Sequence, residues 1–484
     1  MKTDETFKLK PVKRALAGRS ENDTPAVTGA SRGSIKCDIN VDSIAYWNDP
    51  QGTIDREFVT PFAPKGTDEK YITFSTDRGG WNNVRMSMEI IFVIAAALGR
   101  TLVLPPKEPL YRLAADKGNK QRGFADFFPL GTPEFAKKVK TISTAEFIKR
   151  EGGPGGRVPI PVEMIENVTN SALVCEHRKK SKNFCDHLTG YLNSAGYVPD
   201  INSDSCIIFD NDLYAGNSKT NQTESSISSF CGSRKPFTWT SELNDHTLIH
   251  FRAQEKEWRL LAHFYNAIHF TDPSVDNYFK RFVRDFLHYN DQIYCAAGKI
   301  VKALQIEGIE RGFNPDEEGG GIFSAMHIRR GDFQYKKVKI SAEKWYENTK
   351  EVWKPNEIIY IATDERDKSF FDPIAKHHDI RFLDDYWDLA SLGDIDPNYF
   401  GMIDTIVSSR ARAFAGTWFS TFTGYINRMR GYHGMSMKDS WYSFLEKKTK
   451  LHAWENMNIS AYAYEWPDGW IGIDGDVCPE KTEF

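Results

Sequence analysis

The chain has 484 residues, of which 40% are hydrophobic, 13% aromatic and 26% charged, and its formal net charge is −4. This length is enough for about two or three domains with large cores, and the aromatic content excludes a chain that is disordered throughout. The near balance of charge, without a long Lys/Arg block, argues against nucleic acid as a partner. No run of about 18 apolar residues is present, so we expect no membrane span in this chain.

The first 66 residues are predicted to be a flexible tail and a lead-in segment. Residues 1–35 are polar, and the basic residues between Lys8 and Arg14 have no apolar core behind them, so this segment is not a signal peptide. A membrane anchor upstream of Met1 stays open as an alternative.

A strand–loop–helix–strand unit is predicted near residue 70. Tyr71–Ser75 is predicted to be a strand, Asp77–Asn83 a turn-rich loop, and Val84–Leu98 an apolar helix. Gly99 closes the helix, and Thr101–Leu104 follows as a second buried strand. This order is typical of a βαβ unit.

Residues 150–235 are predicted to be a loop-rich insertion, with Gly152–Gly156 and the Asn/Ser/Thr-rich stretch 216–229 as surface connections. Four of the seven cysteines fall inside it, which allows two disulfides in three pairings or, as the alternative, free buried thiols. Four Asn-x-Ser/Thr sequons weakly favour a lumenal protein. The cysteines of the insertion are Cys175, Cys185, Cys206 and Cys231, the others are Cys37, Cys295 and Cys478, and the sequons begin at Asn22, Asn167, Asn221 and Asn458.

The second half of the chain begins with a predicted strand at Thr247–Phe251 and helical patterns at about 253–269 and 275–307. Gly308–Gly321 is rich in Gly, Glu and Asp and is the preferred domain boundary. Beyond it strands and helices alternate, which predicts a parallel, helix-covered sheet whose strands end in polar loops along one edge. The strands are expected at 322–328, Ile358–Ala362 and Arg412–Ala415, and the helices at 341–353, 400–411 and Ser420–Arg430.

The most informative polar cluster follows the strand at 322–328. His327 and Arg329 alternate onto one face of that strand, and Arg330 points away unless the turn begins there. A guanidinium at a strand end can bind a diphosphate bidentately and stabilise charge on a departing phosphate, which suggests a nucleotide-sugar. Asp332 could orient one of the arginines. The alternative is a surface turn held by ion pairs.

Two glycines, Gly79 and Gly80, stand before the first predicted helix. They permit close backbone approach, and the helix start behind them favours an anion. Asn82 and Asn83 belong to the same loop as candidate ligands, although one of them could be only an N-cap.

Hydroxyl groups gather in Gly416–Thr423, where Ser420 and Thr421 open a predicted helix. Hydroxyls and backbone amides at a helix start can bind phosphate, and Phe422 or Trp418 could stack on a base. The alternative is an ordinary serine N-cap.

A carboxylate, Asp364, follows the strand predicted at Ile358–Ala362, where it can hold a ribose hydroxyl or a base amino group. Thr363 or Asp364 could instead cap the next helix. A metal is not required, because an arginine can neutralise the charge that Mg²⁺ neutralises elsewhere. Asp210 and Asp212 are a weaker alternative, as metal ligands beside a diphosphate.

These four segments, in this order, resemble the protein O-fucosyltransferase family and its wider GDP-fucose-dependent superfamily. The resemblance covers about residues 70–110 and 320–435. Gly79–Asn83 with the next helix and Arg100–Pro106 is similar to the N-terminal family motif, His327–Asp332 to the His-x-Arg motif, and Ile361–Asp364 and Phe414–Phe422 to the two C-terminal motifs.

The resemblance implies an α/β protein with a GT-B-like fold, in which two Rossmann-like lobes face a central cleft. The acceptor-side lobe would span 67–310, the nucleotide-sugar-binding lobe 311–440, and 441–484 would pack back on the core. The implied activity is inverting, metal-independent transfer of fucose from GDP-fucose to a hydroxyl of a protein or glycan, without a cofactor, in the ER or Golgi lumen.

Carried over by motif, Arg329 is expected to contact the diphosphate and aid its departure, and Asn83 to lie near the transferred sugar. These two are the catalytic candidates. GDP contacts are expected from His327, Asp364, Ser420, Thr421 and Phe422, with Gly79, Gly80, Asn82, Arg330 and Asp332 as further substrate-binding candidates.

One departure from the family pattern concerns the general base. Some relatives have a glutamate where this chain has Gly80, and Asp77 is a distant substitute. An oxocarbenium-like transition state needs little base help. Two alternatives stay open: another nucleotide sugar, such as a rhamnosyl donor on a polysaccharide, and a catalytically inactive relative that binds a glycan or a protein.

Overall fold

The computed structural model describes residues 33–47, 52–77, 79–108, 121–173, 184–252, 259–315, 321–331, 333, 335–435, 437–443 and 463–474. The chain divides into two compact units. We call Tyr46–Asp291 with Trp418–Lys438 and His452–Phe484 the N-terminal unit, and Gln292–Thr417 with Met1–Ala45 and Asp439–Leu451 the C-terminal unit. None of the helices in the described ranges has the length and apolarity needed to span a bilayer.

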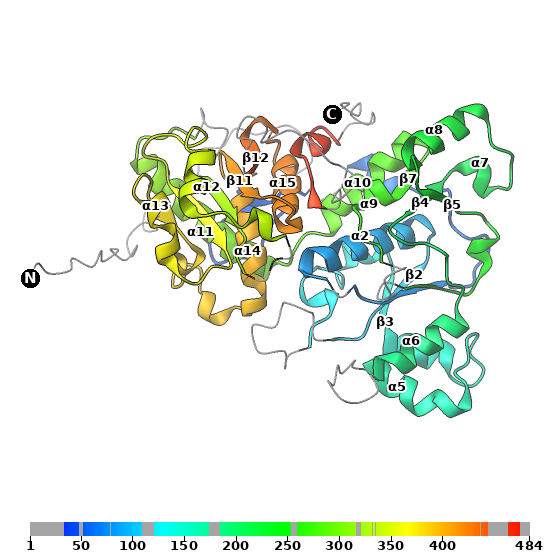
Figure 1. The fold of residues 1–484 in the computed structure, drawn as a ribbon. Helices are drawn as coiled ribbons and strands as arrows, with labels where there is room; N and C mark the ends of the chain where they lie inside the picture. The colour runs from blue at the N-terminus through cyan, green and yellow to red at the C-terminus, as the bar shows by residue number, and fades with distance from the viewer. Residues whose placement is uncertain are drawn as a thin grey trace, which may run out of the picture. The chain divides into compact units, whose positions relative to one another are not determined.

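The predicted βαβ unit is present and forms the centre of the N-terminal unit (Figure 1). β1 (Tyr71–Phe74) and β2 (Thr101–Leu104) pair in parallel, and the helix between them is α2 (Trp81–Ala97), most of whose side chains are buried. The helix begins before the predicted Val84 because Gly80, not an asparagine, takes the N-cap position. The sheet order is β3-β2-β1-β6, with β3 (Thr141–Ser143) and β6 (Leu248–Phe251) at the edges.

The segment 150–235 differs from the predicted loop-rich insertion, since most of its described residues lie in helices or strands. α8 (Asn221–Cys231) occupies the Asn/Ser/Thr-rich stretch, and Thr220 caps it by accepting a hydrogen bond from the Thr223 amide at 3.1 Å. Only Ile227 and Cys231 of this helix are buried, so its apolar periodicity is weak. The other main elements here are α5 (Ile165–Leu173), α6 (Phe184–Ala195), β4 (Ser205–Phe209), α7 (Asn211–Tyr214) and β5 (Lys235–Thr238).

The predicted helical pattern at 253–269 is wrong for its described part, which contains the short α9 (Phe264–Ala267) and then β7 (Ile268–Phe270). β7 completes a second parallel sheet of the N-terminal unit, in the order β5-β4-β7. The pattern at 275–307 is two helices, α10 (Pro273–Phe286) and α11 (Asp291–Glu310). The Asn290 amide between them donates to the Phe127 carbonyl at 2.8 Å, which ends helical pairing there.

The strands of the C-terminal unit that lie in the described residues all pair in parallel, in the order β10-β9-β8-β11-β12. The central strand, β8 (Ser324–Ile328), is buried throughout, and Met326 and Ile328 pack into a core that includes Trp345 and Ile361. This confirms the predicted parallel α/β architecture and places the carboxyl ends of the strands along one edge. The remaining elements are β9 (Ile359–Thr363), β10 (Ile380–Arg381), β11 (Phe414–Thr417), β12 (Ser440–Ser443), α12 (Ala342–Thr349), α13 (Asp372–Ala375) and α14 (Phe400–Ser409), while the helix expected from Ser420 is α15 (Thr421–Tyr432) of the N-terminal unit.

The division between the units falls between Asp291 and Gln292, ahead of the Gly308–Gly321 segment that composition favours. α11 continues into that segment, and a Cβ on Gly308 would stand 2.5 Å from the Ile322 carbonyl oxygen. The glycine therefore permits a close approach of α11 to the segment that leads into β8, inside the C-terminal unit. The predicted C-terminal segment 441–484 is also divided, since β12 belongs to the C-terminal unit and residues 463–474 to the N-terminal unit.

Part of the predicted N-terminal tail is packed rather than flexible. Val41 and Ile44 are buried, and a Cβ on Gly298 of α11 would stand 2.5 Å from the Val41 Cβ. A disulfide between Cys37 and Cys295 ties this segment to α11. Residues 33–45 are therefore an integral part of the C-terminal unit.

A second disulfide joins Cys206 of β4 to Cys231 at the end of α8. It selects one of the pairings that the sequence leaves open, and the free-thiol alternative is wrong for these two residues. Cys175, Cys478 and the side chain of Cys185 lie outside the described residues.

Candidate functional site

The carboxyl end of β8 is held on both sides by threonine hydroxyls from the neighbouring strands. Thr363 of β9 donates to the Ile328 carbonyl at 2.7 Å. Thr417 of β11 donates to the His327 carbonyl at 3.0 Å and accepts from the Arg329 amide at 2.9 Å. The backbone that carries Arg329 is therefore fixed at the point where the strand ends.

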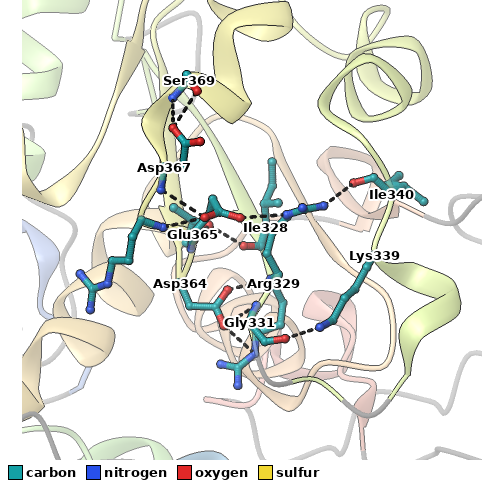
Figure 2. A network of polar contacts seen from close by, with 12 residues as sticks. Ile328, Arg329, Gly331, Lys339, Ile340, Asp364, Glu365, Asp367 and Ser369 are labelled. Atoms are coloured by element: carbon teal, nitrogen blue, oxygen red, sulfur yellow. Dashed lines mark hydrogen bonds and ion pairs between the residues drawn. The ribbon is translucent and has the colours of Figure 1, made fainter.

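The side chain of Asp364 contacts three successive residues of the turn that follows β8 (Figure 2). It accepts hydrogen bonds from the amides of Arg330 at 2.7 Å and Gly331 at 3.1 Å, and its Oδ2 lies 3.1 Å from Nε of Arg329. Burial alone would raise the pKa of Asp364, but the charge of Arg329 and the two amides outweigh it and hold that pKa below its usual value. The alternative that Thr363 or Asp364 caps the next helix is wrong, because Asp367 is that cap.

Arg329 keeps a free recognition surface. Its side chain is 28% exposed, and its two terminal guanidinium nitrogens make no hydrogen bond or ion pair with any residue that the structure describes. The Phe333 ring centre lies 5.9 Å from the guanidinium carbon. The ion pair with Asp364 orients the guanidinium, although Nε makes no hydrogen bond, and the fork is suited to an anion with two acceptor oxygens.

Unlike Arg329, Arg330 uses a terminal guanidinium nitrogen for a hydrogen bond within the chain. Its Nε pairs with Glu365 at 3.1 Å, Nη1 reaches the Ile340 carbonyl at 3.4 Å, and its guanidinium lies over the Phe370 ring at 4.0 Å. Its predicted substrate contact stays a prediction. Asp332, the predicted orienting carboxylate, lies outside the described residues, and Asp364 and Glu365 are the acids that orient the two arginines.

His327 lies inside β8 and is 4% exposed. Burial, reinforced by the charge of Arg329, lowers the pKa of His327 to about 3, so the imidazole is neutral at physiological pH. A neutral imidazole offers one donor and one acceptor and adds no charge next to Arg329.

The Gly79–Asn83 loop belongs to the N-terminal unit. Asn82 is buried, and its Oδ1 accepts from Nε of Arg85 at 3.3 Å. Asn83 packs on Gly79, where a Cβ would stand 2.6 Å from the Asn83 Cβ. Gly79 is thus required by close packing, and Gly80 is the helix N-cap, so neither asparagine serves as that cap.

Asp77 is poorly placed to be a general base. Its carboxylate accepts two hydrogen bonds from Arg259, at 2.9 and 3.0 Å, and a third from the Gly79 amide at 2.6 Å. Its side chain is fully buried and held by these three donors, so a substrate hydroxyl has poor access to it.

A chain of buried charges connects α2 to α15 inside the N-terminal unit. Arg85 pairs with Glu89 on α2, and Glu89 accepts a hydrogen bond at 2.7 Å from Arg428 on α15. Arg428 also pairs with Glu465, whose carboxylate lies 2.9 Å from Nδ1 of His263. These five side chains are at most 2% exposed. The two guanidinium and two carboxylate charges compensate each other, which makes their burial tolerable.

The same contacts show that α2 and α15 run in the same direction. Arg85 lies over the Tyr425 ring at 3.5 Å, and one turn further on Glu89 meets Arg428. Helices that advance together begin at the same end, so the asparagine loop and the start of α15 lie at one end of this helix pair. Two of the four predicted segments are therefore brought together in the N-terminal unit, and the other two in the C-terminal unit.

Ser420 takes the N-cap position of α15, but its side chain makes no capping hydrogen bond, so the ordinary serine-cap alternative is wrong. It is 5% exposed. Phe419 just before it has a φ of 62°, a sparsely populated conformation for a bulky residue that is found most often next to functional sites. Contacts of Ser420, Thr421 and Phe422 with a nucleotide stay predictions.

The carboxylates of the alternative metal site, Asp210 and Asp212, both accept hydrogen bonds from groups of the chain itself. One oxygen of Asp210 caps α7 by accepting from the Leu213 amide at 2.9 Å, and the other accepts from Thr271 at 2.6 Å. Asp212 accepts from the exposed Asn217. Within the described ranges, Cys37, Asp38 and Cys295 are a group of three side chains close enough to share a metal ion, but the two cysteines are joined to each other.

Comparison with known protein families decides the class of protein. The family model described as GDP-fucose protein O-fucosyltransferase matches residues 71–433, more than half of the chain. The chain belongs to this family. Membership makes it a glycosyltransferase and assigns it to fucosyl transfer, and the predicted resemblance is confirmed.

Three solved fucosyltransferase structures illustrate the similarity of this family member to known proteins. A crystal structure of POFUT1 in complex with GDP-fucose is 14% identical, with a TM-score of 0.35, and the match covers 79% of this chain and 99% of that chain. NodZ from Bradyrhizobium is 13% identical, with a TM-score of 0.33 and coverage of 75% and 93%. FUT1 from Arabidopsis thaliana is 11% identical, with a TM-score of 0.30 and coverage of 78% and 70%. A comparison with curated proteins finds no significant match.

Replacing Gly331 by Ala is expected to lower the kcat/KM of this fucosyltransferase by about 10- to 100-fold, because the setting of Arg329 is displaced. A Cβ at Gly331 would stand 2.6 Å from Oδ2 of Asp364, so the carboxylate must move away from the Gly331 amide and from Nε of Arg329. Steady-state kinetics with a nucleotide-sugar donor would measure the loss.

The matched control is Gly190→Ala on α6, where no heavy atom lies within 4 Å of the added Cβ. Equal kcat/KM values for Gly331→Ala and Gly190→Ala would contradict the role given to the Asp364 turn.

Proposed function

We propose that this chain transfers fucose from GDP-fucose to a hydroxyl of a protein or glycan acceptor, with inversion at the sugar carbon and without a metal ion. The observation that carries the proposal is the setting of Arg329. A pre-oriented guanidinium fork, at the carboxyl edge of a parallel sheet and with both terminal nitrogens unpaired among the described residues, suits the two phosphoryl groups of a nucleotide-sugar.

In the proposed reaction, Arg329 binds the diphosphate and stabilises the negative charge that grows as the bond from the sugar to the phosphate breaks. Thr417 and Asp364 position Arg329, since one fixes its backbone and the other pairs with its Nε, and the predicted contact of Asp364 with GDP is part of the proposal. Neutral His327 contributes hydrogen bonds to the nucleotide and leaves the charge of the arginine intact.

On the acceptor side, Asn83 is proposed to lie near the transferred sugar and to orient the attacking hydroxyl. The carboxylate of Asp77 is occupied by Arg259, so we assign no side-chain base. An oxocarbenium-like transition state fits this arrangement, because the hydroxyl then loses its proton late and to water.

The two disulfides among the described residues support a lumenal location for the proposed reaction. Cys37–Cys295 and Cys206–Cys231 are of the kind that persists in oxidising compartments such as the ER lumen and is rare in the cytosol. We therefore propose the ER or Golgi lumen as the site of action.

A donor panel tests the proposal. The protein is incubated with GDP-fucose, GDP-mannose and UDP-linked rhamnose, with and without EDTA, and nucleotide release is measured together with the mass of added sugar on candidate protein and glycan acceptors. We expect GDP-fucose to be preferred, EDTA to have no effect, and the product to gain one fucosyl group. A preference for the rhamnosyl donor, or binding without release of nucleotide from any donor, would reject the proposal in favour of another donor or an inactive relative.

A further inference from the structure

The described ion pairs at the end of β8 leave little net positive charge for a departing diphosphate. Arg329 is paired with Asp364 and Arg330 with Glu365, so the two arginines and two acids sum to zero. A nucleoside diphosphate departs with several negative charges, and a reaction that uses no metal must stabilise them with side chains and amides. A further cation near Arg329 would meet this requirement.

Lys339 is a cation in the right place. Its ammonium donates a hydrogen bond to the carbonyl oxygen of Gly331, the residue whose amide is held by Asp364. Figure 2 shows Lys339 and Asp364 reaching the Gly331 turn from opposite sides, with Arg329 between the two. No carboxylate among the described residues pairs with Lys339.

The backbone around Lys339 is held in place by buried neighbours, so the position from which its side chain extends is fixed. Its neighbours Val338 and Ile340 are 3% and 6% exposed, and the Ile340 carbonyl accepts from Arg330. Ser341 then caps α12 by accepting from the Lys344 amide at 3.3 Å. The side chain therefore projects from a segment that is fixed on both sides.

We propose that Lys339 is a second cationic ligand of the diphosphate, beside Arg329. The inference rests on the proposed function and deepens it. An ammonium group has three donors, so Lys339 keeps one on the Gly331 carbonyl and directs the others to a phosphoryl oxygen. As the sugar–oxygen bond breaks, the electron pair stays on that phosphate, and Lys339 and Arg329 share the new charge.

The competing explanation is that Lys339 only fastens the loop to Gly331. The two roles differ in what they do to ligands of different charge. If Lys339 binds phosphate, removing its charge weakens the binding of GDP and leaves the binding of guanosine unchanged. If Lys339 only fastens the loop, its removal weakens the binding of both.

The test is isothermal titration calorimetry with GDP, GMP and guanosine on the full chain and on Lys339→Met, Lys339→Arg and Lys302→Met. Lys302 is an exposed lysine of α11, so its replacement makes the same change in net charge. For Lys339→Met we expect GDP to bind about tenfold more weakly or worse, with a smaller loss for GMP and guanosine within about twofold of the unmodified chain. Lys339→Arg should recover most of the GDP affinity, and Lys302→Met should bind all three as the unmodified chain does.

The ratio of GDP to guanosine affinity is taken within one preparation, so a partly folded variant does not obscure it. An unchanged ratio for Lys339→Met, or an equal loss for Lys302→Met, overturns the role of Lys339 and leaves the proposed function standing. If the unmodified chain does not bind GDP, the proposed function fails and this inference fails with it.

Discussion

Replacing Arg329 by Lys is expected to lower kcat/KM for the nucleotide-sugar donor by about 10³-fold or more, although the charge is kept. A lysine can still pair with Asp364, but it lacks the planar fork that binds two oxygens of a diphosphate together. Its ammonium is also a point charge that Asp364 would hold directly, whereas Arg329 uses Nε for Asp364 and leaves its terminal nitrogens for the substrate. Steady-state kinetics with GDP-fucose would measure the loss.

The matched control for this experiment is Arg366→Lys. Arg366 is an exposed arginine in the same loop as Asp364, and its backbone amide, not its side chain, makes the described contact with Glu365. We expect Arg366→Lys to keep kcat/KM nearly unchanged. A turnover for Arg329→Lys that equals that of Arg366→Lys would show that the guanidinium does not contact the departing group.

Replacing Arg428 by Met is expected to destabilise the protein by about 3–5 kcal/mol, because it leaves buried carboxylates without their partner. Arg428 holds Glu89 on one side and Glu465 on the other, and both acids are at most 2% exposed. The stability of Arg428→Lys should lie between that of the unmodified chain and that of Arg428→Met, since one ammonium cannot reach both carboxylates with the geometry of a guanidinium. Thermal and denaturant unfolding would measure the change.

Lys350→Met is the control for the stability experiment. Lys350 pairs with Glu347 at 2.9 Å on the surface, with both side chains largely in water, so its replacement should leave the unfolding midpoint nearly unchanged. If Arg428→Met unfolds at the same midpoint as the unmodified chain, the buried cluster is not charge-compensated in the way described above. A lower GDP affinity with unchanged stability would instead indicate that Arg428 acts in nucleotide binding.

The sequence determined those features that depend on residues close together in the chain. The βαβ unit near residue 70 and the alternation after residue 322 follow from apolar periodicity and from Gly and Pro at the element ends, and both are present. The candidate residues His327, Arg329 and Asp364 could be named because polar groups follow strands of one parallel sheet. Where apolar periodicity is weak, as in α8, or an element is three residues long, as in β7, the pattern failed.

Tertiary structure decided which side chains meet. Asp364 stands 35 residues after Arg329 and Glu89 stands 339 before Arg428, and nothing local in the sequence pairs them. The threonines that fix the end of β8, the cation at Lys339 and the Cys37–Cys295 disulfide are equally non-local. The physical reason is that an ion pair or a hydrogen bond depends on the distance and direction between groups, which only the packing of helices and strands sets, whereas periodicity reports no more than which face of an element is buried.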